Sequence, residues 1–197
     1  RNKLSFRQTY FFSFLGYATH GIIDSFTTYG TLLFWPFTDE RIAWNTISVI
    51  DPIFTIPIFI LVILSIVKRN NKFSIYAIIW ILLYQMIAYS QKLRAEDLIY
   101  DYAQTFKHKV KFIEAKPSFG NIIVWKVIYS TSEKYYVNAI RLSLDHKIYP
   151  GESIEKLDVS KSFPWLDANS QQAKDIEKFR WFSNGYLGVD KKNRYII

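Results

Sequence analysis

The chain has 197 residues, of which half are apolar and 18% aromatic, and its formal net charge is +8. This length fits one domain or two small ones. The chain contains no cysteine, which excludes disulfides, thiolate metal ligands and a cysteine nucleophile. The positive charge alone would allow nucleic-acid binding. However, the basic residues are scattered or flank apolar segments, a pattern typical of membrane proteins. We therefore expect a lipid bilayer as the partner, and no nucleic acid.

Three apolar segments in the first half of the chain predict a bundle of about three transmembrane helices. Residues 8–23 form the first and shortest segment. Residues 46–67 form a run of 22 with a single charge, Asp51, and residues 73–90 add 18 more without any charge. About 20 apolar residues span the hydrocarbon core of a bilayer.

The charges that flank these segments predict the topology. Residues 68–72, "KRNNK", form a short basic loop, which is typical of a cytoplasmic turn. This places the basic residues 1–7 inside, residues 24–45 outside and the tail, residues 91–197, outside the cytoplasm. The chain begins at Arg1 and no cleavage-site pattern follows, so we expect missing upstream residues rather than a signal peptide.

The second half of the chain reads as a small α+β domain. Residues 92–107 predict a helix that leaves the membrane. The segments "KVKFIEAKP", "NIIVWKVIYS" and "KYYVNAIRLSL" are rich in β-branched and aromatic residues and predict strands, with "TSEK" as a hairpin turn and "YPGES" as a break. Residues 169–183 predict a helix, and a short strand pair is expected around "DKKN". We therefore divide the chain into a transmembrane region, residues 1–91, and a soluble α+β domain, residues 92–197.

An ionisable pair lies in and just after the first apolar segment. On a helix, His20 and Asp24 share one face, which Thr27 continues. Titratable groups within a membrane usually face a protein interior or a wet cavity. Imidazole and carboxylate are good ligands for zinc or manganese. Asp51 begins the next apolar helix and would reach the same end of the bundle. We predict that His20, Asp24 and Asp51 hold one divalent metal ion together with other ligands.

Simpler interpretations of these residues stay open. His20 could be an interfacial histidine that is bonded to a carbonyl group, and Asp24 could pair with His20 or with an arginine. Asp51 followed by Pro52 is a helix-start signature with aspartate as the N-cap, and capping does not exclude metal binding.

The segment between the first two apolar helices combines aromatic and charged residues. Asp39 and Arg41 in "PFTDER" read first as a solvated turn. The aromatic residues fit an interfacial belt: Tyr29, Trp35, Phe37 and Trp44.

The stretch "THGIIDSFTTYGTLLFWPFTDERIAWNTISVIDPIFTIP" closely resembles the core signature of a family of membrane-bound, metal-dependent hydrolases, the YdjM-like, LexA-regulated inner-membrane proteins. The resemblance covers roughly residues 15–60. Its pattern falls on His20, Asp24, Thr27 or Thr28, Gly30, Pro36, Phe37, Arg41 and Asp51. Members usually carry a further N-terminal His-Arg…Thr-His segment that is expected to complete the metal site, and this sequence lacks it.

The resemblance implies a multi-pass hydrolase of the bacterial inner membrane. Water bound to the metal would attack an ester or phosphoester, because the metal lowers the pKa of that water toward neutrality. Thr27 or Asp39 would orient a ligand, and Arg41 would receive an anionic group of the substrate. A location near the membrane surface favours a lipid-like substrate.

Two other functions compete with the hydrolase. The first is a non-enzymatic membrane protein whose soluble tail binds a partner, in which His20 and Asp24 are a structural pair. The second is a transporter fragment in which the same pair relays protons.

Overall fold

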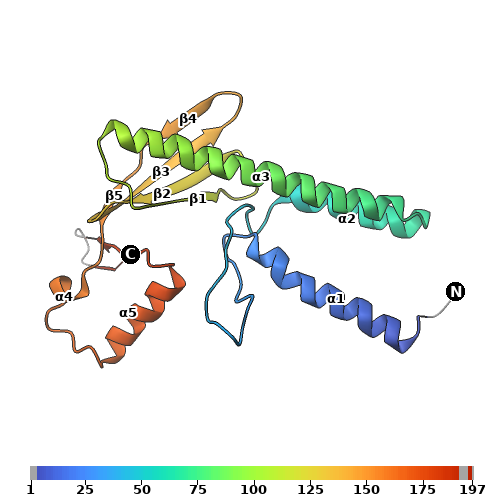
Figure 1. Ribbon diagram of the computed structural model, residues 1–197, viewed down its shortest axis with the longest axis horizontal. Helices are drawn as coiled ribbons and strands as arrows, with labels where there is room; N and C mark the ends of the chain where they lie inside the picture. Colours follow the sequence, from blue (N-terminus) through green and yellow to red (C-terminus); the bar gives the residue numbers. More distant parts are fainter. Residues whose placement is uncertain (1–3, 191–194, 197) are drawn as a thin grey trace.

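The computed structural model describes residues 4–190 and 195–196. Three helices come first along the chain, and an antiparallel sheet with two further helices follows (Figure 1). The first three helices are α1 (Phe6–Ser25), α2 (Pro52–Lys68) and α3 (Lys72–Thr105). Helices α2 and α3 lie side by side, whereas α1 diverges from them.

Helix α2 begins where the Asp-Pro signature indicates. Asp51 is its N-cap: Oδ1 accepts hydrogen bonds from the backbone N–H groups of Ile53, at 3.1 Å, and Phe54, at 3.2 Å. Proline at the first helical position needs no such bond. The helix-start interpretation of Asp51 is therefore confirmed, and residues 46–51 belong to the preceding loop.

The expectation of about three membrane spans is not supported. Among the described residues, one helix, α3, is long and apolar enough to cross a bilayer. Helix α2 is apolar but has only 17 residues, because the Asp51 cap starts it late. Helix α1 has 20 residues, but polar groups such as Arg7, His20 and Asp24 interrupt its apolar sequence. The multi-pass topology and the side of the tail are likewise not supported.

Helix α3 joins the two halves of the molecule. It runs without a break through residues 91–92, the expected domain boundary, and so includes most of the helix predicted for residues 92–107. Beyond that point Ala95, Ile99 and Ala103 are fully buried against the sheet. These residues are four apart and mostly small, so the helix can approach the strands closely.

The sheet confirms the predicted strands. Its order is β1-β2-β3-β4 with every pair antiparallel, and β5 pairs with the other end of β3. Trp125, Ile140 and Leu142 form its core beneath α3. The predicted "TSEK" turn joins β2 to β3, and "YPGES" separates β4 from β5. The strands are β1 (Phe112–Pro117), β2 (Val124–Ser130), β3 (Lys134–Leu142), β4 (His146–Tyr149) and β5 (Ser153–Glu155).

The end of the chain forms two helices and a strand pair. The short α4 (Val159–Ser162) precedes α5 (Gln171–Phe182), which confirms the predicted helix. Strands β6 (Val189–Asp190) and β7 (Tyr195–Ile196) pair as expected, although most of the "DKKN" turn lies outside the described residues. Between α5 and β6, the Tyr186 ring contacts the rings of Phe112 and Tyr135.

Candidate functional site

The loop between α1 and α2, residues 26–51, contains most of the polar residues singled out in the sequence. Thr27 Oγ1 donates to the Asp24 carbonyl oxygen at 2.8 Å and accepts from the Gly30 N–H at 3.2 Å. Gly30 has φ 69°, and a Cβ atom there would lie 2.5 Å from the Ile42 carbonyl oxygen. The Thr-x-x-Gly part of the signature therefore forms a turn that requires glycine.

Asp51 connects the start of α2 to α3 through hydrogen bonds. The residue is only 2% exposed. Its Oδ1 caps α2, and its Oδ2 accepts a hydrogen bond from the Tyr84 hydroxyl of α3 at 2.7 Å. Both carboxylate oxygens thus have partners inside the protein, which satisfies a buried acid. The structure gives Asp51 a structural role, and its role as a metal ligand stays a prediction.

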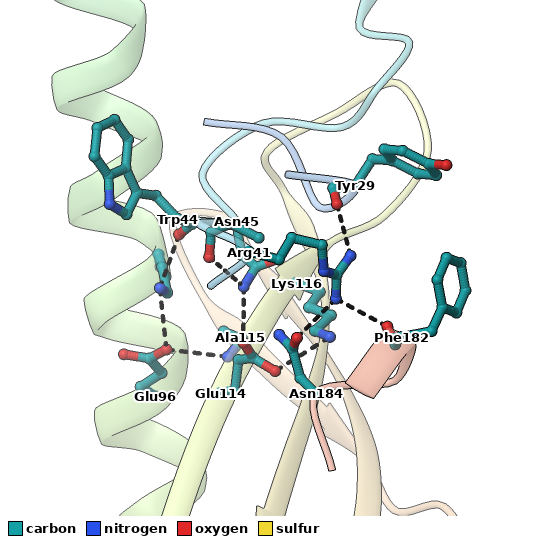
Figure 2. A network of polar contacts seen from close by, with 12 residues as sticks. Tyr29, Arg41, Trp44, Asn45, Glu96, Glu114, Ala115, Lys116, Phe182 and Asn184 are labelled. Atoms are coloured by element: carbon teal, nitrogen blue, oxygen red, sulfur yellow. Dashed lines mark hydrogen bonds and ion pairs between the residues drawn. The ribbon is translucent and has the colours of Figure 1, made fainter. Parts of the chain in front are cut away.

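Arg41 ties the loop to the end of α5 (Figure 2). One guanidinium nitrogen donates to the Tyr29 carbonyl oxygen at 2.6 Å. The other donates to the Phe182 carbonyl oxygen at 3.0 Å and to Asn184 Oδ1 at 2.8 Å. The Asp39 carbonyl oxygen accepts from the Trp181 indole at 3.2 Å. The contacts with Phe182, Asn184 and Trp181 join residues about 140 positions apart, and the predicted catalytic roles of Asp39 and Arg41 stay untested.

A pocket of about 390 Å³ lies beside Arg41. Its lining also includes Arg180, which is paired with Glu177 at 3.1 Å. The Arg41 guanidinium is therefore at a surface recess, although three carbonyl or amide oxygens already accept its hydrogen bonds.

A second network joins the loop to α3 and the edge strand β1 (Figure 2). Lys92 Nζ donates to the Trp44 carbonyl oxygen at 2.9 Å and lies 3.8 Å from Glu96. Glu96 accepts from the Ala115 N–H of β1 at 3.0 Å. The free edge of β1 is thus bound by a helix side chain rather than left for another strand.

Asn45 and Glu114 complete this junction. Asn45 Nδ2 donates to Glu114 Oε1 at 2.8 Å, and Lys116 Nζ lies 3.1 Å from Glu114 Oε2. Burial, together with the nearby Glu114 carboxylate, raises the pKa of Tyr186 far above its usual value. The sequence did not predict this contact. Asn45 and Glu114 are 69 positions apart, and Glu114 and Lys116 alternate with apolar residues as in an ordinary two-faced strand.

His20 and Asp24 lie together in the last two turns of α1. His20 Nε2 is 3.3 Å from Asp24 Oδ2, and the two side chains are 70% and 41% exposed. Within residues 4–190 and 195–196, no set of three or more histidine or acidic side chains is grouped so as to hold a metal ion. The structure therefore brings His20 and Asp24 together but does not group Asp51 with them, and the three-ligand metal site stays a prediction.

A comparison with known protein families gives a match in the helical, apolar first half of the chain. Residues 2–95 match the model of the family described as YdjM inner membrane protein. Together with the apolar helix α3, this match indicates an inner membrane protein. The description gives a location and no reaction. No curated protein and no solved structure matched the chain.

Within the YdjM match, the signature residues fall into two groups. Thr27, Arg41 and Asp51 make hydrogen bonds that shape the loop or join it to other elements. His20 and Asp24 contact each other from an exposed face of α1. His20 and Asp24 are therefore the potential metal ligands of the signature that are exposed, and this pair is our candidate functional site.

Proposed function

We propose that the protein is a metal-dependent hydrolase of the inner membrane in which His20 and Asp24 bind a divalent ion, zinc or manganese. The 3.3 Å contact between them carries the proposal, because it holds two ligand types at a spacing where one ion can reach both. Their exposure also leaves the pair open to an ion, to water and to a substrate.

The residues present fit part of such a site. A catalytic zinc typically has three protein ligands and one open position. His20 and Asp24 supply two, and a third would be Asp51, after release from Tyr84, or a donor that lies outside the described residues. The bound metal would supply an activated water for attack on an ester or phosphoester. Arg41 lies on the adjoining loop and would attract an anionic substrate.

Metal content tests this proposal directly. The full chain is purified in lipid nanodiscs, and its zinc and manganese are measured by mass spectrometry for the parent, His20→Ala, Asp24→Ala and Asp51→Asn. His146→Ala is the matched control, since His146 lies on exposed strand β4. We expect bound metal to fall roughly tenfold or more in the first two variants and to stay unchanged in the control.

Activity is measured on the same samples with phosphate and carboxylate esters of nitrophenol, before and after chelation. Loss of hydrolysis on chelation, with recovery on adding zinc or manganese, supports the proposal. Equal and negligible metal in the parent and in all variants overturns it.

The second candidate function is a non-enzymatic membrane protein whose tail binds a partner. The internal contacts of Arg41 and Asp51 favour it, because they give signature residues a structural purpose without catalysis. In that case His20 and Asp24 form an exposed ion pair, and their replacement changes neither metal content nor hydrolysis.

A further inference from the structure

The level at which the bilayer surface meets the protein can be located on α3. The uncharged run of α3, residues 73–90, ends beside the loop of residues 26–51. Thr46 Oγ1 donates to Gln85 Oε1 at 2.8 Å, and Lys92 Nζ donates to the Trp44 carbonyl oxygen at 2.9 Å. These two contacts fix the loop at the point where α3 changes from apolar to charged, which is where a span leaves the bilayer core.

This loop exposes large aromatic side chains at that level. Phe37 is 93% exposed, and Phe34, Trp35 and Tyr29 are also exposed. Aromatic side chains concentrate in the headgroup region of a membrane, where an apolar ring can meet a partly wet surface. The loop tip therefore fits the bilayer interface.

Helix α5 is attached to this loop rather than to the sheet. Its C-terminal end receives hydrogen bonds from Arg41, and its Trp181 donates to the Asp39 carbonyl oxygen. Figure 1 shows α4 and α5 standing apart from the sheet, with one end of α5 directed toward the loop. Trp181 and Phe182, at the C-terminal end of α5, thus lie beside residues 39–41 of the same loop.

The α4–α5 segment, residues 159–182, exposes its own apolar side chains. Trp165 is 76% exposed, and Phe179 and Phe182 are about half exposed. An apolar recess of about 390 Å³ lies between Trp165, Ile176 and Phe179. A soluble protein rarely leaves such a surface uncovered, so an occupant is expected.

The occupant that we infer for this surface is the lipid interface of the membrane. The charges on α5 favour attachment through aromatic rings rather than through binding of anionic lipid. Lys178 lies 3.9 Å from Asp175, and Arg180 lies 3.1 Å from Glu177. With Lys174, the helix carries three basic and two acidic side chains, a net charge of only +1, so it has no strong basic face for electrostatic attachment. Aromatic side chains next to paired charges suit the headgroup region of a bilayer.

We propose that the α4–α5 segment is a second membrane-contacting element, whose aromatic side chains Trp165, Phe179 and Phe182 lie in the headgroup region next to the aromatic loop. The sheet domain is then held against the bilayer at two places, along α3 and along α5. This inference does not depend on the proposed hydrolase activity.

Site-specific labelling of the full chain tests the contact, because the sequence has no cysteine to interfere. Single cysteines replace Trp165, Phe179, Phe37 or Phe106, and each carries an environment-sensitive fluorophore. The proteins are placed in phosphatidylcholine vesicles with and without lipids that carry a quencher at the headgroup. Phe106 is the matched control, since its aromatic side chain is 54% exposed and it lies at the C-cap of α3, well beyond Lys92 and the bilayer surface.

We expect lipid-borne quenching at Trp165→Cys and Phe179→Cys to match that at Phe37→Cys and to exceed that at Phe106→Cys at least threefold. Raised salt should leave this quenching unchanged. The proposal is overturned if labels at Trp165 and Phe179 behave like the Phe106 label. It is also overturned if they are shielded from both lipid-borne and aqueous quenchers, which would indicate a protein partner or a second copy.

Discussion

The helical region and the sheet domain cover their apolar side chains in different ways. In the sheet domain, Trp125, Ile140 and Leu142 are at most 1% exposed, because α3 closes over them. In α1, Phe6 and Tyr17 are more than four-fifths exposed, and within the described residues no other helix packs along it. The sheet domain therefore supplies its own core, whereas the helical region needs an apolar solvent to complete it, which agrees with an inner membrane protein.

This comparison predicts that core truncation will be costly in the sheet domain and mild in α1. Trp125→Ala should lower the free energy of unfolding by about 3–5 kcal/mol, because it leaves a large cavity under α3. Phe14→Ala in α1 should cost far less in lipid nanodiscs, since lipid fills the space. Chemical unfolding followed by circular dichroism measures both. Equal losses would contradict the idea that lipid completes α1.

The loop between the two regions should be sensitive to its turn glycine. Gly30→Ala forces a side chain into the Ile42 carbonyl and into an unfavourable φ, so we expect a loss of about 1–3 kcal/mol. Proteolysis within residues 26–51 should accelerate. Gly16→Ala is the control: nothing lies within 4 Å of its added Cβ, so stability should be unchanged or should rise by up to about 1 kcal/mol.

The Asp51–Tyr84 contact should stabilise the pairing of α2 with α3. Asp51→Ala removes the helix cap and leaves the buried Tyr84 hydroxyl without its acceptor, which should cost about 1–3 kcal/mol. Asp51→Asn keeps a capping oxygen and should cost less. Thermal unfolding of both variants and of Tyr84→Phe, combined in a double-mutant cycle, measures the contact. Independent, additive effects would show that the hydrogen bond contributes little.

The smallest expected effect concerns the attachment of α5. Arg41→Ala should reduce global stability by only about 1 kcal/mol, because its partners are surface carbonyl and amide groups. Hydrogen exchange across residues 171–184 should nevertheless rise. Arg180→Ala removes an exposed ion pair and serves as the control, with little expected change. An unchanged exchange rate in Arg41→Ala would show that α5 is held by other contacts.

Local patterns were sufficient for much of the fold. The strands between residues 112 and 142, the turn between β2 and β3 and helix α5 all lie close to where β-propensity, turn residues and helix periodicity place them. Two sequence signals disagreed at the start of α2: apolar content suggested residue 46, whereas the Asp51–Pro52 signature predicted the start that the structure shows at residue 52. A capping hydrogen bond decided that boundary over hydropathy.

The contacts of the candidate site could be predicted only in part from the sequence. His20 and Asp24 were predicted as neighbours because a helix brings residues four apart together, and they are in contact. The partners of Arg41 and Asp51 could not be predicted, since Phe182, Asn184 and Tyr84 are far away in the sequence.

The sequence by itself determined the apolar helix that suits a bilayer, the His20–Asp24 spacing and the order of the strands along the chain. Only the tertiary structure decided that α3 continues from the apolar region into the core of the sheet, that Asn45 meets Glu114 and that Arg41 holds α5. The physical reason is the distance along the chain over which each interaction acts. Helix periods, caps and turns act over a few residues, whereas these contacts depend on how whole elements pack, and packing leaves no local pattern in the chain.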